Sequence, residues 1–112
     1  MVYDAARSEV VLFGGNESSL NAETWTWDGP PWMLRATTGP SARNYHAMAY
    51  DAARGEVVLF GGNPRNGETW GWDGQSWALR ATSGPSPRSW HAMVYDAAWR
   101  GRALRRLHPL AK

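Results

Sequence analysis

Two short runs of unbroken apolar residues, 10–13 and 57–60, are the clearest hydrophobic pattern in the chain. Each run follows a glutamate and ends in a pair of glycines, at 14–15 and 61–62. The runs are too short for a helix and too apolar to turn one face to water, so each predicts a strand buried on both faces. The glycines mark places where the backbone turns or packs closely.

The chain repeats itself with a period of about 46 residues, which is in the range of propeller blades. Residues 4–15 match 51–62 at 11 of 12 positions, residues 24–37 match 69–82 at 10 of 14, and residues 45–53 match 90–98 at 7 of 9. Short strands repeated at this spacing predict an all-β chain.

Each unit divides into four strand-like pieces separated by turn formers. In the second unit these pieces are residues 46–50, 56–62, 68–72 and 76–82. Alternation along the third piece places Trp70 and Trp72 on the same face. The pattern therefore predicts one four-stranded antiparallel sheet for each unit.

The order of motifs resembles the kelch repeat. In the second unit it runs Arg43, His46-Ala47, Gly61-Gly62, Trp72-Asp73 and Trp77, and the neighbouring units supply Arg88, His91, Gly14-Gly15, Trp27-Asp28 and Trp32. The WD repeat has a similar period and a Trp-Asp pair, but it lacks this diglycine and begins with a Gly-His pair that is not seen here. The resemblance implies two kelch-type blades, a partial β-propeller.

The same resemblance divides the chain into four parts. It implies a first blade at 1–43, a second at 44–88, the first strand of a third repeat at 89–98, and a basic non-kelch tail at 99–112. The tail lacks strand alternation and is predicted to be disordered or part-helical. Residues 1–6 are identical to 93–98, so Met1 falls midway along a first strand. A truncated gene or a shifted reading frame is one explanation of the start in mid-strand and of the non-repeat tail.

Composition narrows the classes of function. Cysteine is absent, which excludes disulfides, thiolate metal sites and the Tyr–Cys cofactor of the kelch-like copper-radical oxidases. Residues 1–98 hold seven Arg against ten acidic residues, a net charge of −3, whereas the tail holds five basic residues and no acid. No basic stripe crosses the repeats and no apolar run reaches membrane-spanning length. We expect no nucleic-acid or membrane partner, and a cytoplasmic location by default in the absence of a signal peptide.

No pattern for catalysis is evident. Paired loop carboxylates, a nucleophile–base pair and a phosphate loop are all missing from the sequence, so we expect neither an enzyme nor a cofactor. His46 and His91 hold one repeat position and have no metal-ligand spacing around them. We expect both histidines, Tyr50, Tyr95 and the repeated tryptophans to serve packing.

The resemblance also suggests where a partner binds, because kelch-like propellers use the loops after the second and fourth strands of each blade. The candidates in these loops are Asn16, Glu17, Arg43, Tyr45, Asn63, Arg65, Arg88 and Trp90. Arg43 and Arg88 could form bidentate bonds with carboxylates of an acidic peptide. Equally, each could be tied to loop carbonyls or to a carboxylate of its own blade.

Two blades leave two apolar outer faces uncovered. Several hundred Å² on each face, at about 25 cal/mol per Å², is a cost comparable with the stability of a whole domain. Copies stacked head to tail, for example three chains in a six-blade ring, would cover those faces. We expect a non-enzymatic module that binds a protein or peptide and copies of itself. The alternatives are a lectin-like propeller and a truncated fragment without a function of its own.

Overall fold

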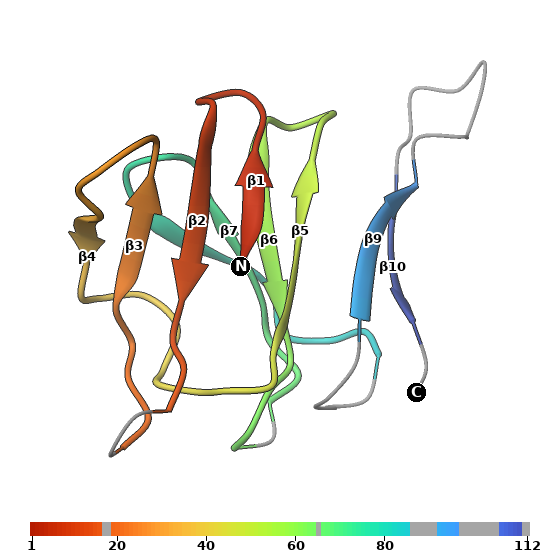
Figure 1. Ribbon diagram of the computed structural model, residues 1–112. Helices are drawn as coiled ribbons and strands as arrows, with labels where there is room; N and C mark the ends of the chain where they lie inside the picture. Colours follow the sequence, from red (N-terminus) through yellow and green to blue (C-terminus); the bar gives the residue numbers. More distant parts are fainter. Residues whose placement is uncertain (17–18, 65, 86–91, 97–105, 111–112) are drawn as a thin grey trace.

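A computed structural model describes residues 1–16, 19–64, 66–85, 92–96 and 106–110, and within these ranges it contains strands and turns but no helix (Figure 1). None of the described segments therefore forms a helix that could cross a membrane. The strands are β1 (Val2–Asp4), β2 (Glu9–Phe13), β3 (Thr24–Trp27), β4 (Met33–Ala36), β5 (Ala47–Asp51), β6 (Glu56–Phe60), β7 (Thr69–Trp72), β8 (Trp77–Ala81), β9 (Ala92–Asp96) and β10 (Arg106–Leu110).

The strands form two four-stranded antiparallel sheets, as the repeat predicts. The first sheet has the order β1-β2-β3-β4, and the second has the order β5-β6-β7-β8. Each strand pairs with its neighbour in sequence, so all connections within a sheet are short. The second and third strands of the two sheets pair in corresponding registers, Val10↔Trp27 in one and Val57↔Trp72 in the other.

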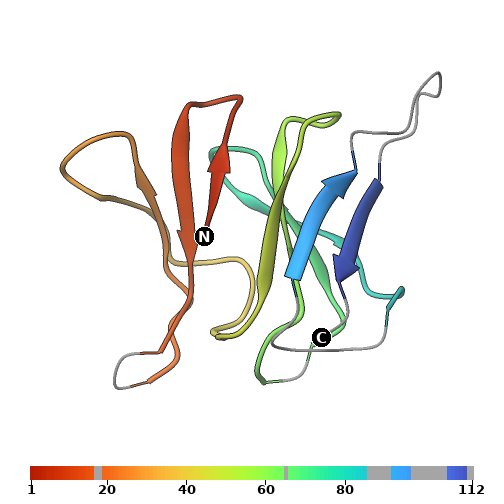
Figure 2. The same ribbon diagram turned by 45° about the vertical axis from the view of Figure 1, so that its right-hand side comes forward.

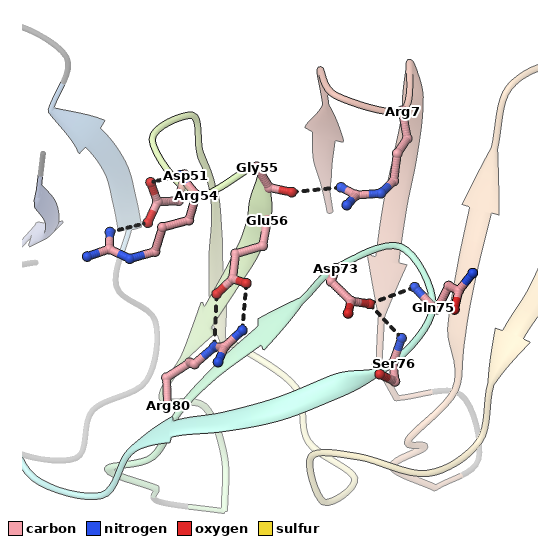
Figure 3. Close-up of polar contacts among 9 residues, drawn as sticks. All are labelled: Arg7, Asp51, Arg54, Gly55, Glu56, Asp73, Gln75, Ser76 and Arg80. Carbon is pink, nitrogen blue, oxygen red and sulfur yellow. Dashed lines mark hydrogen bonds and ion pairs between the residues drawn. The ribbon is translucent and has the colours of Figure 1, made fainter.

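Aspartates close the turns between strands through their side chains. Asp51 Oδ1 accepts the backbone N–H groups of Ala53 and Arg54, and Asp4 does the same in the first sheet. Between β7 and β8, Asp73 Oδ1 accepts the N–H groups of Gln75 and Ser76, both at 2.9 Å (Figure 3). The N–H of Ser76, followed by that of Gln75, lowers the pKa of Asp73.

The prediction of a disordered or part-helical tail is wrong for Arg106–Leu110, which form β10. This strand pairs with β9, with Arg106 opposite Asp96 and Leu107 opposite Tyr95. The register is that of the second sheet, where Glu56 lies opposite Asp51. Backbone pairing depends little on side chains, and a lone strand presents unpaired N–H and C=O groups. The tail can therefore hold the place of a second strand without repeating its sequence.

The two sheets pack face to face, and side-chain alternation gives each sheet two faces. We call front face the one that carries Val11 and Phe13 in β2, or Val58 and Phe60 in β6, and back face the opposite one. The front face of the first sheet covers the back face of the second. Their shared core consists of Val11, Phe13, Met48, Val57, Leu59 and Trp72. The first strands β1, β5 and β9 lie in succession along this stack (Figures 1 and 2).

Trp77 joins the two sheets at the outer part of this interface. Its Nε1 donates to Thr24 Oγ1 at 2.8 Å, and its ring meets that of Phe13 edge to face at 5.5 Å. A Cβ at Gly39 would lie only 2.6 Å from Trp77 Cδ1, so glycine is required there for the close approach. One tryptophan thus supplies apolar area and a directional bond between segments 53 residues apart.

We expect a double-mutant cycle to measure this bond. Trp77→Phe removes the donor and Thr24→Val removes the acceptor, so each single change leaves one polar group without its partner. The coupling in the free energy of unfolding should be about 1 kcal/mol. Urea unfolding of the four proteins, followed by tryptophan fluorescence and circular dichroism, gives that value. Additive single effects would show that the bond contributes nothing to stability.

Candidate functional site

Three loops lie at the same end of the molecule, the lower end in Figure 1. They are the β2–β3 loop, the β4–β5 connection and the β6–β7 loop, which follow the second and fourth strands of the sheets. The middle one, residues 37–46, is tied to both of the others. Gly15 N donates to Arg43 O at 2.9 Å, and Asn44 and Asn63 exchange two backbone bonds of 3.0 and 2.7 Å.

The side chain of Arg43 is the centre of this loop cluster. It is 1 % exposed, and its Nη1 donates to Gly61 O at 3.1 Å. Its Nε and Nη2 donate to the carbonyl and the hydroxyl of Ser41, and Nη2 lies 3.9 Å from a carboxylate oxygen of Glu68. The β4–β5 connection is thereby fixed to the diglycine that ends β6.

One glycine of each diglycine packs closely against the β4–β5 connection. Gly14 and Gly62 have φ of +71° and +114°, in the region that favours glycine. A Cβ on Gly14 would lie 2.5 Å from Arg43 O, and one on Gly62 would lie 3.0 Å from Asn44 O. The backbone of Arg43 thus leaves no room for a side chain at Gly14, and at Gly62 the positive φ and the tight contact together favour glycine.

Arg43 therefore serves the fold, as the alternative reading of that residue expected. Burial lowers the pKa of Arg43 from its ordinary value, and the carboxylate of Glu68 opposes that shift. The guanidinium donates hydrogen bonds to carbonyl oxygens of its own chain and is shielded from solvent. Arg43 positions the loops around it and is not part of an exposed binding surface.

Three other candidates are described and exposed at this end. Asn16 and Asn63 follow the two diglycines, and Tyr45 is 43 % exposed. Tyr45 has φ of +57°, an uncommon value for a residue with a side chain. The paired backbones of Asn44 and Asn63 hold it in that conformation. The cluster therefore presents one phenol and two amide side chains to solvent. Glu17, Arg65, Arg88 and Trp90 lie outside the described residues, as does His91.

Several other aromatic residues pack within the sheets, but Trp32, for which packing was also expected, is 39 % exposed. The His46 ring meets Phe13 edge to face at 5.6 Å. Trp25 and Trp70 lie in corresponding strands, and each donates its indole N–H to the glutamate two residues earlier, at 3.0 Å. No group of three His, Asp or Glu side chains among the described residues is arranged to hold a metal ion.

A second feature was not predicted from the sequence: a hollow of about 600 Å³ on the front face of the second sheet. It is lined by Asp51, Arg54, Glu56, Val58, Thr69 and Arg80. Arg80 forms two bonds with Glu56, of 3.0 and 2.7 Å, and Arg54 pairs with Asp51 at 2.7 Å (Figure 3). The charges of the hollow are thus paired with each other.

One difference between the repeats shapes this hollow. Thr26 of the first sheet corresponds to Gly71 of the second. In the first sheet Arg35 Nε donates to Thr26 Oγ1 at 2.8 Å, and Arg35 Nη2 stays 3.9 Å from Glu9. The carboxylate of Glu56 takes the space that a Cβ at position 71 would need, and its bonds raise the pKa of Arg80. In the sequence, the difference between Thr26 and Gly71 is the only signal of the Glu56–Arg80 pair and of the hollow beside it.

We expect Arg43→Lys to lower the free energy of unfolding by about 1–3 kcal/mol, because a lysine keeps the charge but cannot reach Ser41 and Gly61 together. Arg35→Lys is the matched control. Arg35 has a 41 % exposed side chain, and its loss should cost under about 1 kcal/mol. Chemical unfolding of both variants measures the difference. Equal costs would contradict the positioning role of Arg43.

We also expect a small pH effect from Asp73. Its pKa is lower in the folded chain, so the carboxylate contributes stability that is present above the pKa of the unfolded chain, near 4. That contribution is lost as the pH falls through the folded-state pKa. Unfolding measured from pH 6 to pH 2 should show the wild type losing more stability than Asp73→Asn below about pH 4. Parallel curves would contradict this.

Comparisons with known proteins add no family to this description. The sequence matches no protein-family model, and no curated protein matches it. The resemblance to kelch repeats therefore stands on the motifs and their spacing.

Proposed function

We propose that this chain is a non-enzymatic, kelch-type interaction module of β-propeller architecture that binds a protein or peptide through the loop end around Asn16, Tyr45 and Asn63. The observation that carries the proposal is the convergence of three loops from two stacked sheets at one end, held together through Arg43. A ligand that spans this end would contact both repeats at once.

The chemistry of this end suits a peptide. Asn16 and Asn63 offer amide donors and acceptors that match a peptide backbone. Tyr45 adds an exposed ring that buries area at low entropic cost, a common feature of binding surfaces. Arg43 contributes rigidity here, because its guanidinium bonds lie within the chain.

The two sheets stack front to back, and β9 continues the series of first strands begun by β1 and β5. Such stacking of four-stranded antiparallel sheets around an axis is how propellers cover both faces of each blade. We propose that each sheet of this chain is one blade, and that copies of the chain are among its partners.

The test is selection from a random-peptide library displayed on phage, with the immobilised chain as bait. Selected peptides should bind saturably in isothermal titration, and Tyr45→Ala should weaken that binding at least tenfold, about 1.4 kcal/mol. Leu79→Ala is the control, since Leu79 is 45 % exposed on β8, away from the loop end. Equal loss in both variants, or saturable binding of a sugar on a glycan array and of no peptide, would contradict the proposal.

A further inference from the structure

Residues of the same type stand at corresponding positions of the two back faces, but they differ in burial. In the second sheet Val57, Leu59 and Trp72 have 0 % exposure, because the first sheet covers them. The corresponding residues of the first sheet, Val10, Leu12 and Trp27, are all partly exposed. The back face of the first sheet is thus an apolar surface that no other sheet covers, whereas the back face of the second sheet is covered by the first.

Larger side chains extend this uncovered face. Trp32, which corresponds to Trp77, is 39 % exposed and packs against Trp27 with 5.2 Å between ring centroids. Tyr3 is 54 % exposed and lies opposite Val10 on the same face. A contiguous group of exposed aromatic and aliphatic side chains marks an association surface.

The front face of the second sheet carries the groups that would receive such a surface. Thr69 corresponds to Thr24, the acceptor for Trp77, and lines the hollow. Gly84 corresponds to Gly39, whose lack of a side chain leaves room for the Trp77 ring. Nothing lies within 4 Å of a Cβ at Gly84. The receiving position for a tryptophan is present and open.

The polar contact at the turns is repeated as well. Arg7 reaches from the first sheet to the second, where its Nη1 donates to Gly55 O at 2.8 Å (Figure 3). Its side chain also fills the space that a Cβ at Gly74 would need. Arg54 corresponds to Arg7 and lines the hollow with a 57 % exposed side chain. Gly29 corresponds to Gly74, and a Cβ there would meet nothing within 4 Å.

We propose that the front face of the second sheet binds the back face of the first sheet of a second copy, reproducing the interface inside the chain. Trp32 of the second copy then donates to Thr69, and Arg54 donates to the backbone carbonyl of Ser8 of the second copy. The contact is head to tail, since two different faces meet. The inference rests on the stacking of blades in the proposed function and names the faces and residues that perform it.

The pair β9–β10 determines how readily this contact forms. β9 packs beside β5, just as β5 packs beside β1, so it holds the place that β1 of a docked second copy requires. Docking therefore moves β9 and β10 away from β5. A change that weakens the pairing of β9 should therefore strengthen self-association. Val94→Pro, in the middle of β9, should weaken that pairing because proline has no backbone N–H to donate to a β-ladder.

The first experiment is the molar mass of the full chain in solution, from light scattering on a size-exclusion column over a range of concentrations. We expect the mass to rise from 12.5 kDa toward multiples of it, and to rise at lower concentration for Val94→Pro. If both proteins stay monomeric at the highest soluble concentration, the inference is overturned.

Point variants then test the two faces separately. Trp32→Ala damages the back face, and Thr69→Arg fills the front-face hollow, so each should raise the dissociation constant of the self-association at least tenfold. Leu79→Ala, which removes a similarly exposed apolar side chain outside both faces, should leave it unchanged. Loss of association in Leu79→Ala as well would indicate nonspecific clustering and overturn the inference.

Mixing the two damaged proteins gives the sharpest result. The intact front face of Trp32→Ala can still bind the intact back face of Thr69→Arg, while every other pairing includes a damaged face. The mixture should form a complex of two chains, with twice the mass of 12.5 kDa, and nothing larger. A mixture that stays monomeric would overturn the head-to-tail arrangement.

This outcome is separable from that of the peptide experiment. Tyr45 lies at the loop end and outside both docking faces, so Tyr45→Ala should weaken peptide binding and leave the molar mass unchanged. Trp32→Ala should lower the molar mass of the associated species and leave peptide binding unchanged. Failure of association with intact peptide binding overturns this inference alone, and failure of peptide binding with intact association overturns the loop-end proposal alone.

Discussion

The buried guanidinium of Arg43 is the interaction on which the arrangement of the loops depends. A charge removed from water is tolerated only where hydrogen bonds replace its solvation. Here the oxygens of Ser41 and Gly61 do so, with Glu68 nearby. Because these acceptors belong to different loops, satisfying one side chain fixes the geometry of both. The exposed Tyr45 and Asn63 are held by the same backbone segment.

Most of the fold could be predicted from the sequence because its determinants are local. The apolar run after Glu56, the two glycines and the turn at Asp73 define a strand, its end and a hairpin without reference to the rest of the chain. The role of Arg43 could not be chosen in the same way. Its two readings differ only in whether an acceptor lies 18 residues away along the chain, at Gly61 O, and that is a tertiary fact.

β10 shows the opposite limit of sequence reasoning. Its residues, Arg-Leu-His-Pro-Leu, include a proline and lack the unbroken apolar run of β2 and β6, yet they pair with β9 along their whole length. The hollow on the second sheet was missed for a related reason. The second sheet has Gly71 where the first sheet has Thr26, and the missing side chain leaves the space into which Glu56 extends toward Arg80. Such an effect becomes visible only when three residues from three strands are placed together.

The charged pairs on the two front faces bear on how the second sheet would accept a neighbour. Burying an ion pair is costly unless its members are already well bonded to each other. On the covered first sheet, Glu9 is 9 % exposed and Arg35 bonds to Thr26. On the open second sheet, Glu56 and Arg80 are joined by two short bonds. Two parallel bonds fix both groups before any neighbour arrives, so covering this face requires little further reorganisation of its charges.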